Sequence, residues 1–177
     1  MKLSPHEVAD LAIKAGFSAT VKAAGLTDSE AVVFVAVCIG ESGLDSDVMA
    51  RSADKLPDGT PNPNAGNRDH GLGQISGRWN YDKIQAVGGN WRDPAVNIGV
   101  CYRIFTGAAR QFTPWHVYTG GGYKAWLPDA RLAVAHPWPY VDRAATSSTQ
   151  LTALTAGVTA LRADVAAVLA SLRKHLT

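Results

Sequence analysis

The sequence lacks the features that mark several broad classes of protein. It has no run of about 18 apolar residues, so we expect no membrane-spanning helix. The N-terminal stretch MKLSPHEVADLAIKAG has neither a long apolar core nor a small-residue cleavage site, so we expect no secretory signal. Basic residues do not cluster, and 17 of them against 15 acidic residues give a net charge of +2. This balance does not favour nucleic acid as a partner.

Cysteine is nearly absent as well. Cys38 and Cys101 both lie in apolar stretches, and we expect two buried free thiols, with a single disulfide as the alternative. Neither cysteine has a second Cys or a His at the spacing of metal ligands. His70 and His116 are not part of an HExxH pattern or an equivalent one. We therefore expect no metal site and no cofactor.

Apolar residues are plentiful, at 46% of 177, and this is enough to build a proper core. Capping residues, prolines at first helical positions and terminating glycines predict helices. These predicted helices lie at Ser4–Gly16, Phe17–Gly25, Asp93–Gly107 and Pro128–Ala135. The segment Asp54–Asn67 is rich in Pro, Gly, Asn and Asp, which predicts a long surface loop.

The longest apolar run is Ala31–Ile39, nine residues that lead directly into Gly40 and Glu41. Its valines and isoleucine suit a buried strand as well as a helix. The preceding Thr27–Glu30 has the pattern of a capping box with acidic residues in the first turn, which favours the helix. A helix that is apolar on every face belongs in the middle of a core.

Glu41 would then lie in the last turn of this central helix. The apolar surroundings and the negative end of the helix dipole both disfavour its charge, so we expect its pKa to be raised. A carboxylic acid that keeps its proton near neutral pH is what cleavage of a glycosidic bond requires. The alternative is a capped core helix whose Glu41 simply emerges into solvent.

The C-terminal part has a different pattern. Residues 144–150 are small and polar and are interpreted as a linker after a domain of residues 1–143. Residues 151–177 carry apolar side chains at alternating spacings of three and four, which predicts a coiled coil between copies. These side chains are Leu151, Leu154, Val158, Leu161, Val165, Val168 and Leu172. The alternative is an amphipathic helix folded back onto its own domain.

Four ordered motifs between Glu30 and Leu127 resemble those of the lysozyme-like superfamily, especially phage-type lytic transglycosylase and lysozyme domains. Glu41-Ser42 is similar to the Glu-Ser that ends the central helix of soluble lytic transglycosylases. Gly71–Ile75 is similar to their Gly-Leu-Met-Gln-Ile motif, with Gly73 at the Met position. The other two matches are Pro94–Tyr102, in which Asn97, Ile98, Gly99 and Tyr102 recur, and Trp115–Leu127, which places Tyr118 at a motif tyrosine.

A second resemblance concerns Asp69–Trp79. This segment is similar to the Asp-Tyr-Gly-Ile-Leu-Gln-Ile-Asn-Ser-Arg-Trp segment of chicken-type lysozymes, with His70 in place of Tyr. The match places Asp69 at the second catalytic carboxylate of those enzymes. The roles implied for the two acids are therefore borrowed from lysozyme by analogy.

Together the resemblances imply a mainly α fold, namely a lysozyme-like domain with a long central buried helix and a small loop and β region. They imply cleavage of the β-1,4 glycosidic bonds of peptidoglycan by a lysozyme (muramidase) or a lytic transglycosylase. Glu41 would be the general acid, and Asp69 would be either a second catalytic residue or a turn residue. The implied substrate-binding residues are Ser42, His70, Gly71, Gln74, Ile75, Tyr118 and Trp79.

The implied partner is a peptidoglycan glycan strand. Because no secretory signal is expected, the setting would be a phage, with a tail-associated lysin in the virion or an endolysin in the host cytoplasm before release to the cell wall. The helix 151–177 would join copies of the chain into a homo-oligomer or bind phage tail proteins. The rival interpretation is a structural tail or baseplate protein that keeps the lysozyme scaffold without activity.

Overall fold

The computed structural model describes residues 1–51, 60 and 68–140. The segment Asp54–Asn67, predicted as a surface loop, lies outside the described residues apart from Thr60. The predicted linker 144–150 and the predicted coiled-coil helix 151–177 also lie outside them. The described residues belong to a compact unit that ends at Tyr140. The domain boundary at residue 143 therefore stays a prediction.

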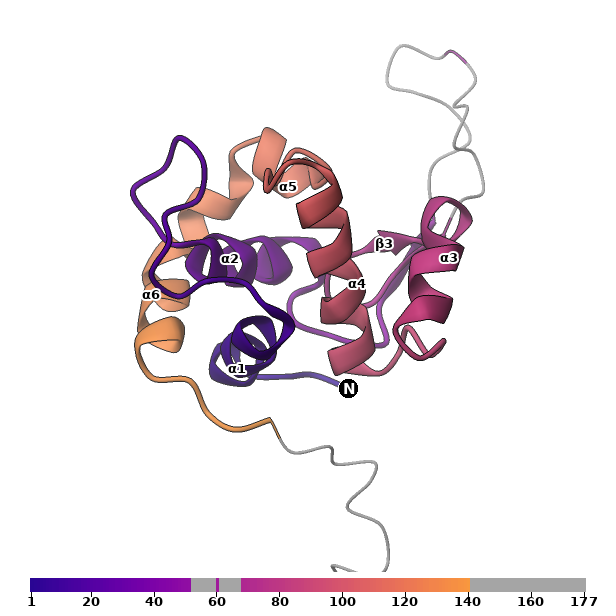
Figure 1. The fold of residues 1–177 in the computed structure, drawn as a ribbon, viewed down its shortest axis with the longest axis horizontal. Coiled ribbons are helices and arrows are strands. Elements are labelled where there is room, and N and C mark those ends of the chain that lie inside the picture. Colours follow the sequence, from indigo (N-terminus) through magenta and orange to yellow (C-terminus); the bar gives the residue numbers. More distant parts are fainter. Residues whose placement is uncertain (52–59, 61–67, 141–177) are drawn as a thin grey trace, which may run out of the picture. The chain divides into compact units, whose positions relative to one another are not determined.

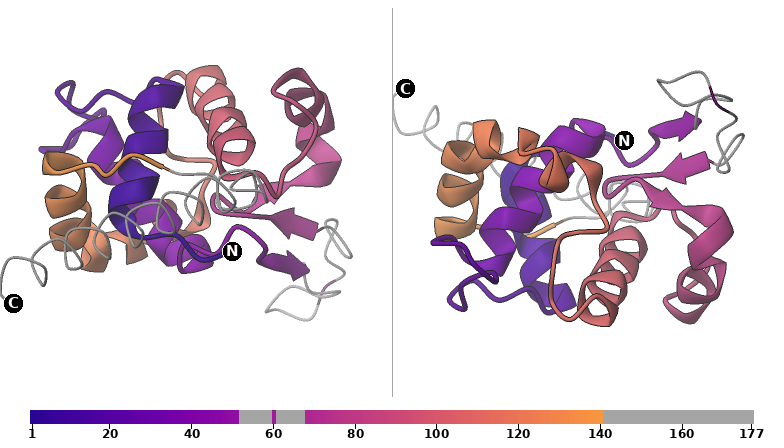
Figure 2. Two further views of the ribbon diagram at one scale, coloured as in Figure 1. Left: turned by 90° about the horizontal axis from the view of Figure 1, so that it is seen from below. Right: turned by 90° about the horizontal axis from the view of Figure 1, so that it is seen from above.

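The described part of the chain is mainly helical, with a small antiparallel sheet, which confirms the predicted fold class. α1 (Pro5–Ala15), α2 (Glu30–Ser42) and α6 (Leu127–Ala135) pack against one another. α4 (Pro94–Gly107) packs against α1 on one side and against α3 and β3 on the other (Figure 1, Figure 2). The C-terminal half of α2, which carries Glu41, and the sheet, which carries Asp69, thus belong to the same compact unit.

The sheet has three short antiparallel strands in chain order. They are β1 (Met49–Arg51), β2 (Arg68–His70) and β3 (Ile75–Ser76). In the central strand, Asp69 is opposite Ala50 of β1 and Ser76 of β3. α3 (Gly77–Ala86) follows β3 directly and packs against α4. Asp69 is thereby held by pairing on both sides.

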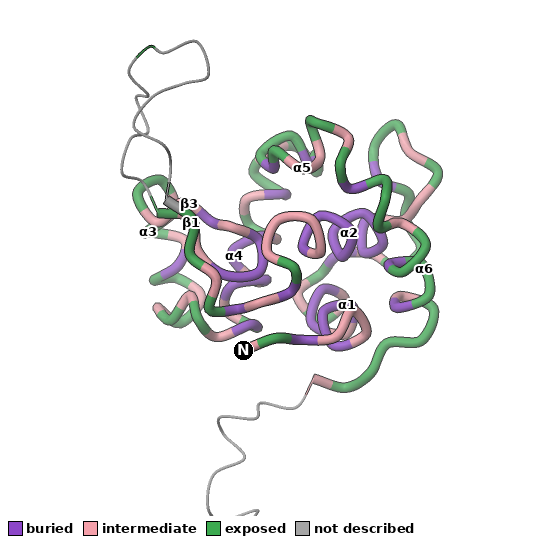
Figure 3. Tube along the Cα trace, turned by 180° about the vertical axis from the view of Figure 1, so that it is seen from behind, coloured by how far each residue is buried: buried purple, intermediate pink, exposed green. Residues whose placement is uncertain are grey.

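α2 is the helix predicted from the apolar run Ala31–Ile39, and the strand alternative was wrong. All residues from Ala31 to Cys38 are buried, which Figure 3 shows as a continuous buried helix in the core. The helix ends where Gly43 takes a left-handed conformation, with φ of 59°. Glu41 therefore lies in the last turn, as predicted.

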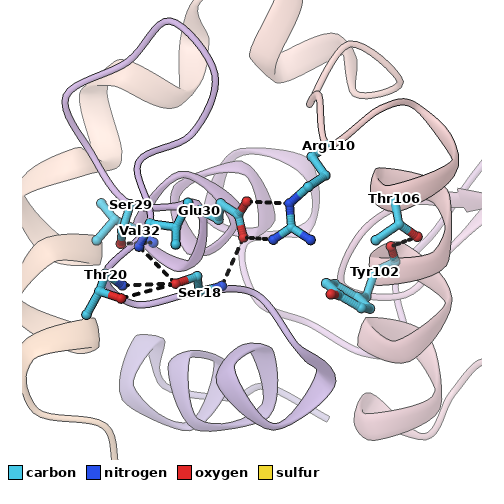
Figure 4. A network of polar contacts seen from close by, with 9 residues as sticks. Ser18, Thr20, Ser29, Glu30, Val32, Tyr102, Thr106 and Arg110 are labelled. Atoms are coloured by element: carbon cyan, nitrogen blue, oxygen red, sulfur yellow. Dashed lines mark hydrogen bonds and ion pairs between the residues drawn. The ribbon is translucent and has the colours of Figure 1, made fainter.

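The start of α2 differs from the prediction. The N-cap is Ser29, whose hydroxyl accepts the N–H of Val32 at 3.4 Å, so the capping box predicted for Thr27–Glu30 was wrong. Glu30 is the first helical residue, and its carboxylate is bound by Arg110 and by the N–H of Ser18 (Figure 4). The Glu30 carboxylate is therefore engaged elsewhere and makes no bond to the N–H of Thr27, which the predicted capping box requires.

The helix ends predicted for α1 and α4 are confirmed. The Ser4 hydroxyl accepts the N–H of Glu7 at 3.3 Å, Pro5 is the first helical residue, and Gly16 ends α1 in the left-handed region. The Asp93 carboxylate accepts the N–H of Ala95 at 2.8 Å at the start of α4. These caps are local in sequence, so their pattern could be recognised without tertiary information.

The short helix predicted over Phe17–Ala24 does not form. The backbone of this segment bonds to the start of α2 instead. The carbonyl oxygen of Val21 accepts the N–H of Glu30, and that of Ser18 accepts the N–H of Ala31, each at 3.0 Å. The segment therefore satisfies its hydrogen-bonding groups through tertiary contacts, which compete with a helix of that length.

α5 (His116–Thr119) and the 3-10 helix η1 (Gly122–Trp126) connect α4 to α6 and pack against α2. Cys38 and Cys101 are buried free thiols, as expected. Among the described residues, no helix has both the length and the apolar content needed to cross a membrane.

Candidate active site

Glu41 is half-buried at the end of α2, and no Lys or Arg of the described residues forms an ion pair with it. Its Oε1 accepts a hydrogen bond from the backbone N–H of Val117 in α5, at 3.0 Å. Burial raises the pKa of Glu41, and the negative charge of Asp69 raises it further, whereas the Val117 N–H and the positive charge of His116 act in the opposite direction. The net shift is upward, as predicted. A group with a raised pKa keeps its proton to a higher pH.

Asp69 lies half-buried in β2, and burial raises its pKa as well. Its charge acts on the pKa of Glu41, so the two carboxyl groups are close enough to interact through space. The structure therefore brings together the two predicted catalytic residues, one from α2 and one from the central strand.

A cleft of about 330 Å³ opens beside Asp69. Its wall combines a carboxylate, amides and a hydroxyl with two tryptophans, which suits a ligand that has polar edges and apolar faces, as a sugar ring does. The lining residues are Asp69, Gly73, Gln74, Ile75, Ser76, Trp79, Asn80, Ile104, Pro114 and Trp115. Glu41 is not one of them, but Trp115 lies two residues before Val117, whose N–H binds Glu41. The cleft wall and the hydrogen-bond partner of Glu41 thus share one short segment.

Two predicted substrate-binding residues, Trp79 and Gln74, present groups to this cleft. Trp79 of α3 is 60% exposed, and the Arg78 guanidinium lies 4.9 Å from the centre of its ring. Gln74 has a positive φ of 46°. Its Nε2 donates to the carbonyl oxygens of Gly71 at 2.8 Å and Val48 at 3.4 Å. The Gln74 side-chain oxygen has no partner among the described residues, so it is available to a ligand.

Three other predicted residues are engaged in the protein itself. The Ser42 hydroxyl donates to the carbonyl oxygen of Cys38 at 3.0 Å and accepts the N–H of Leu44 at 3.1 Å. The His70 ring packs on Trp91, with ring centres 4.2 Å apart, and burial lowers its pKa. Ile75 is 2% exposed and belongs to both the core and the cleft wall.

Tyr118 does not line the cleft beside Asp69. Its ring packs against Tyr123, at 4.9 Å between ring centres, and against Phe112. It lines a second cavity of about 240 Å³, which Arg110 also lines. The backbone of the neighbouring Val117, rather than a side chain, binds Glu41.

Sequence reasoning gave no role to Val117, and it placed Trp115 only at the start of the motif Trp115–Leu127. The Trp115 indole N–H donates to the carbonyl oxygen of Gly73 at 2.9 Å and so ties the loop before α5 to the turn after β2. A tryptophan in an aromatic-rich segment was a usable signal for Trp115. Nothing in the sequence marked Val117, because every residue except proline has a backbone N–H.

Among the described residues, no group of three His, Cys, Asp or Glu side chains could hold a metal ion.

A buried central helix ends in Glu41, which has no Lys or Arg partner among the described residues, and a small sheet carries a second acid, Asp69, at the wall of a cleft. This arrangement is that of a lysozyme-like domain. Comparison with protein families agrees, since a model of the family described as lysozyme-like domain matches residues 10–117. The chain belongs to this lysozyme-like domain family. Membership indicates, in general terms, a glycosidase that acts on peptidoglycan. Comparisons with curated proteins and with solved structures return no match.

Proposed function

We propose that residues 1–143 form a domain that cleaves the β-1,4 glycosidic bonds of peptidoglycan glycan strands. The observation that carries this proposal is the state of Glu41, which is half-buried, has no basic partner among the described residues and has a raised pKa. Breaking a glycosidic bond requires a proton on the leaving oxygen. Glu41 is the group that can hold this proton and donate it.

Asp69 has two alternative roles in this proposal. As a carboxylate beside the anomeric carbon it would stabilise the oxocarbenium-like transition state or bond to it, which gives a retaining hydrolase. Otherwise Glu41 acts alone and a hydroxyl group of the substrate closes an anhydro sugar, as in lytic transglycosylases. Burial raises the pKa of both Glu41 and Asp69, so these shifts alone do not favour one route over the other.

We infer that the glycan strand lies in the cleft beside Asp69. The exposed face of Trp79 offers a stacking surface for a sugar ring, and the free oxygen of Gln74 can accept an N–H of an N-acetyl group. Gly71 of the same turn and Ile75, the first residue of β3, would contribute backbone groups. Ser42, His70 and Tyr118 stay proposed contacts at the edges of the site.

We further propose a phage setting, either a tail-associated lysin of the virion or an endolysin that reaches the wall from the host cytoplasm. The support is the heptad pattern of residues 151–177, which suits an oligomer or a contact with tail proteins. Sedimentation of the full chain should give an oligomer mass. A variant with lysine at two seam positions, Leu161→Lys with Val165→Lys, should give a monomer, and identical masses for both would contradict the coiled coil.

Purified peptidoglycan incubated with the full chain tests the enzyme proposal. We expect turbidity to fall and soluble glycan fragments to appear. Mass spectrometry of these fragments separates the two routes, because a hydrolase leaves reducing ends and a transglycosylase leaves anhydro ends. Absence of soluble products from walls of several chemotypes would contradict the enzyme and favour the structural tail or baseplate alternative.

A further inference from the structure

The turn Gly71–Gln74 connects β2 to β3 and forms part of the cleft wall. Two side chains from outside the turn bind it, namely Trp115, which donates to the carbonyl oxygen of Gly73, and the fully buried Asn97 of α4, which makes more of the contacts. Asn97 Nδ2 donates to the carbonyl oxygens of His70 at 3.0 Å and Trp91 at 3.1 Å. Its Oδ1 accepts the N–H of Gly73 at 3.0 Å. The amide of Asn97 thus holds both the entry to the turn and its middle.

The Asn97 amide is fully buried, and all of its hydrogen-bonding groups are engaged. The Cys101 thiol also approaches its Oδ1, at 4.0 Å, so both amide hydrogens and both lone pairs of the oxygen have partners. A Cβ on Gly71 would lie 2.3 Å from Asn97 Nδ2, and one on Gly73 would lie 2.2 Å from Cys101 Sγ. A side chain at either glycine would therefore push the turn away from α4.

We propose that Asn97 is a positioning residue for substrate binding, which holds the turn Gly71–Gln74 in the shape that the glycan strand needs. This inference rests on the proposed glycosidase function. Gly73 and Gln74 line the cleft, and Gln74 Nε2 is bonded to Gly71 within the same turn. The orientation of the Gln74 side chain therefore depends on the turn that Asn97 fixes. A binding surface fixed in advance does not have to be ordered when the ligand arrives, which favours affinity.

The substitution Asn97→Ser tests this proposal, because serine cannot reach all of the partners of the amide. We expect the KM for purified glycan strands to rise about tenfold, while kcat per folded molecule changes less than about threefold. The reason for the split is that Asn97 contacts the binding turn and makes no contact with Glu41 or Val117. Kinetics are measured below the unfolding temperature of each variant.

The control is Glu30→Gln, which weakens an ion pair at the other end of α2 and does not touch the turn. It should lower the unfolding midpoint and leave KM unchanged. If Asn97→Ser behaves in the same way, with the parent's KM and a rate that follows the folded fraction, the role of Asn97 is only structural and the proposal is overturned.

A second variant keeps the test decisive if Asn97→Ser does not fold. Cys101→Ala removes the thiol that packs between Gly73 and Asn97 and breaks none of the stronger hydrogen bonds of the turn. We expect a KM two- to threefold above the parent's, and an unchanged KM overturns the proposal. A parent protein that cleaves no glycan overturns the glycosidase function together with this inference. A parent that cleaves, with a KM insensitive to the variants, overturns this inference alone.

Discussion

Glu30 and Glu41 stand near the two ends of one helix, α2, and the protein surrounds them differently. Glu30 is 2% exposed, and its carboxylate receives two hydrogen bonds from Arg110 and one from the N–H of Ser18 (Figure 4). Glu41 is half-buried and receives one hydrogen bond, from the N–H of Val117. No basic side chain of the described residues pairs with it. Residue type and helix are the same at both sites, so the surroundings set the difference.

The helix itself contributes to this difference. Its N-terminal end carries a partial positive charge that stabilises the carboxylate of Glu30, and its C-terminal end carries a partial negative charge that disfavours a charge on Glu41. Arg110 forms an ion pair with Glu30, whereas no Lys or Arg of the described residues pairs with Glu41. Burial raises the pKa of Glu41 by more than the Val117 N–H and the charge of His116 lower it. One buried helix thus holds one acid in an ion pair and another without a Lys or Arg partner among the described residues, and the second is the acid proposed for proton transfer.

The substitution Glu41→Gln should give the largest effect, a loss of about 10²- to 10⁴-fold in the rate of glycan cleavage. Glutamine keeps the size of the side chain and an oxygen for the Val117 N–H, but it has no proton to donate. Turbidity loss of purified walls measures the rate, and circular dichroism checks that the fold is intact. Lysis at the parent's rate would remove Glu41 from the catalytic role.

The substitution Asp69→Asn should have the next largest effect, but only in a hydrolase. If the products have reducing ends, we expect a loss of about 10²-fold, because asparagine cannot carry the charge that stabilises the transition state. If the products have anhydro ends, the loss should stay below about tenfold. Rate and product mass are measured on the same digest. Reducing ends together with full activity of this variant would show that Asp69 is only a strand residue.

The substitution Glu30→Gln should have the opposite effect to Glu41→Gln, because it should lower the stability of the fold and leave the rate of glycan cleavage unchanged. We expect a loss of about 2–3 kcal/mol in the free energy of unfolding, near the low end for breaking a buried ion pair, because Arg110 is itself partly exposed. Urea denaturation measures this loss. The matched control is Asp28→Asn, which weakens a more exposed pair with Arg131 and should cost less than about 1 kcal/mol. Equal losses of unfolding free energy in the two variants would mean that the burial of Glu30 does not make its ion pair more important for stability than the exposed pair.

The same two glutamates show how far sequence reasoning reaches. The apolar run before Glu41 and the caps at Ser4 and Asp93 are local patterns, and they predicted α1, α2 and α4 correctly. The role of Glu30 was misjudged because Arg110, eighty residues further along the chain, determines it. No local pattern contains such a partner.

In the candidate site, too, local patterns could be recognised in the sequence, and contacts between distant segments could not. Motifs singled out Glu41 and Asp69 as candidates, and their catalytic roles stay predictions. The upward pKa shift of Glu41 could be inferred from its apolar surroundings, and it is confirmed. The N–H of Val117 could not be found, because its contribution comes from the backbone. Gly73, where lytic transglycosylases have Met, was a departure without explanation in the sequence. The structure supplies one, since the Cys101 thiol fills the space that a side chain at position 73 would need.

The effect of pH on stability gives the smallest and most specific test of the comparison. Because the pKa of Glu41 is raised in the folded protein, the folded state binds this proton more tightly than the unfolded chain does. The resulting stabilisation is complete below the ordinary pKa of glutamate and is lost as the pH rises through the raised value. The Glu41→Gln variant lacks this loss, so its stability relative to the parent should increase with pH across that window.

The increase should be smaller than the effect of Glu30→Gln, because Glu41 is only half-buried and solvent screens its charge. Cleavage by the parent should fall over the same window, because the general acid loses its proton there. Urea unfolding of both proteins at a series of pH values, with turbidity assays of the parent beside it, measures both changes. Parallel stability curves would show that Glu41 has the same pKa in the folded and unfolded states, and the contrast with Glu30 would then rest on hydrogen bonding alone.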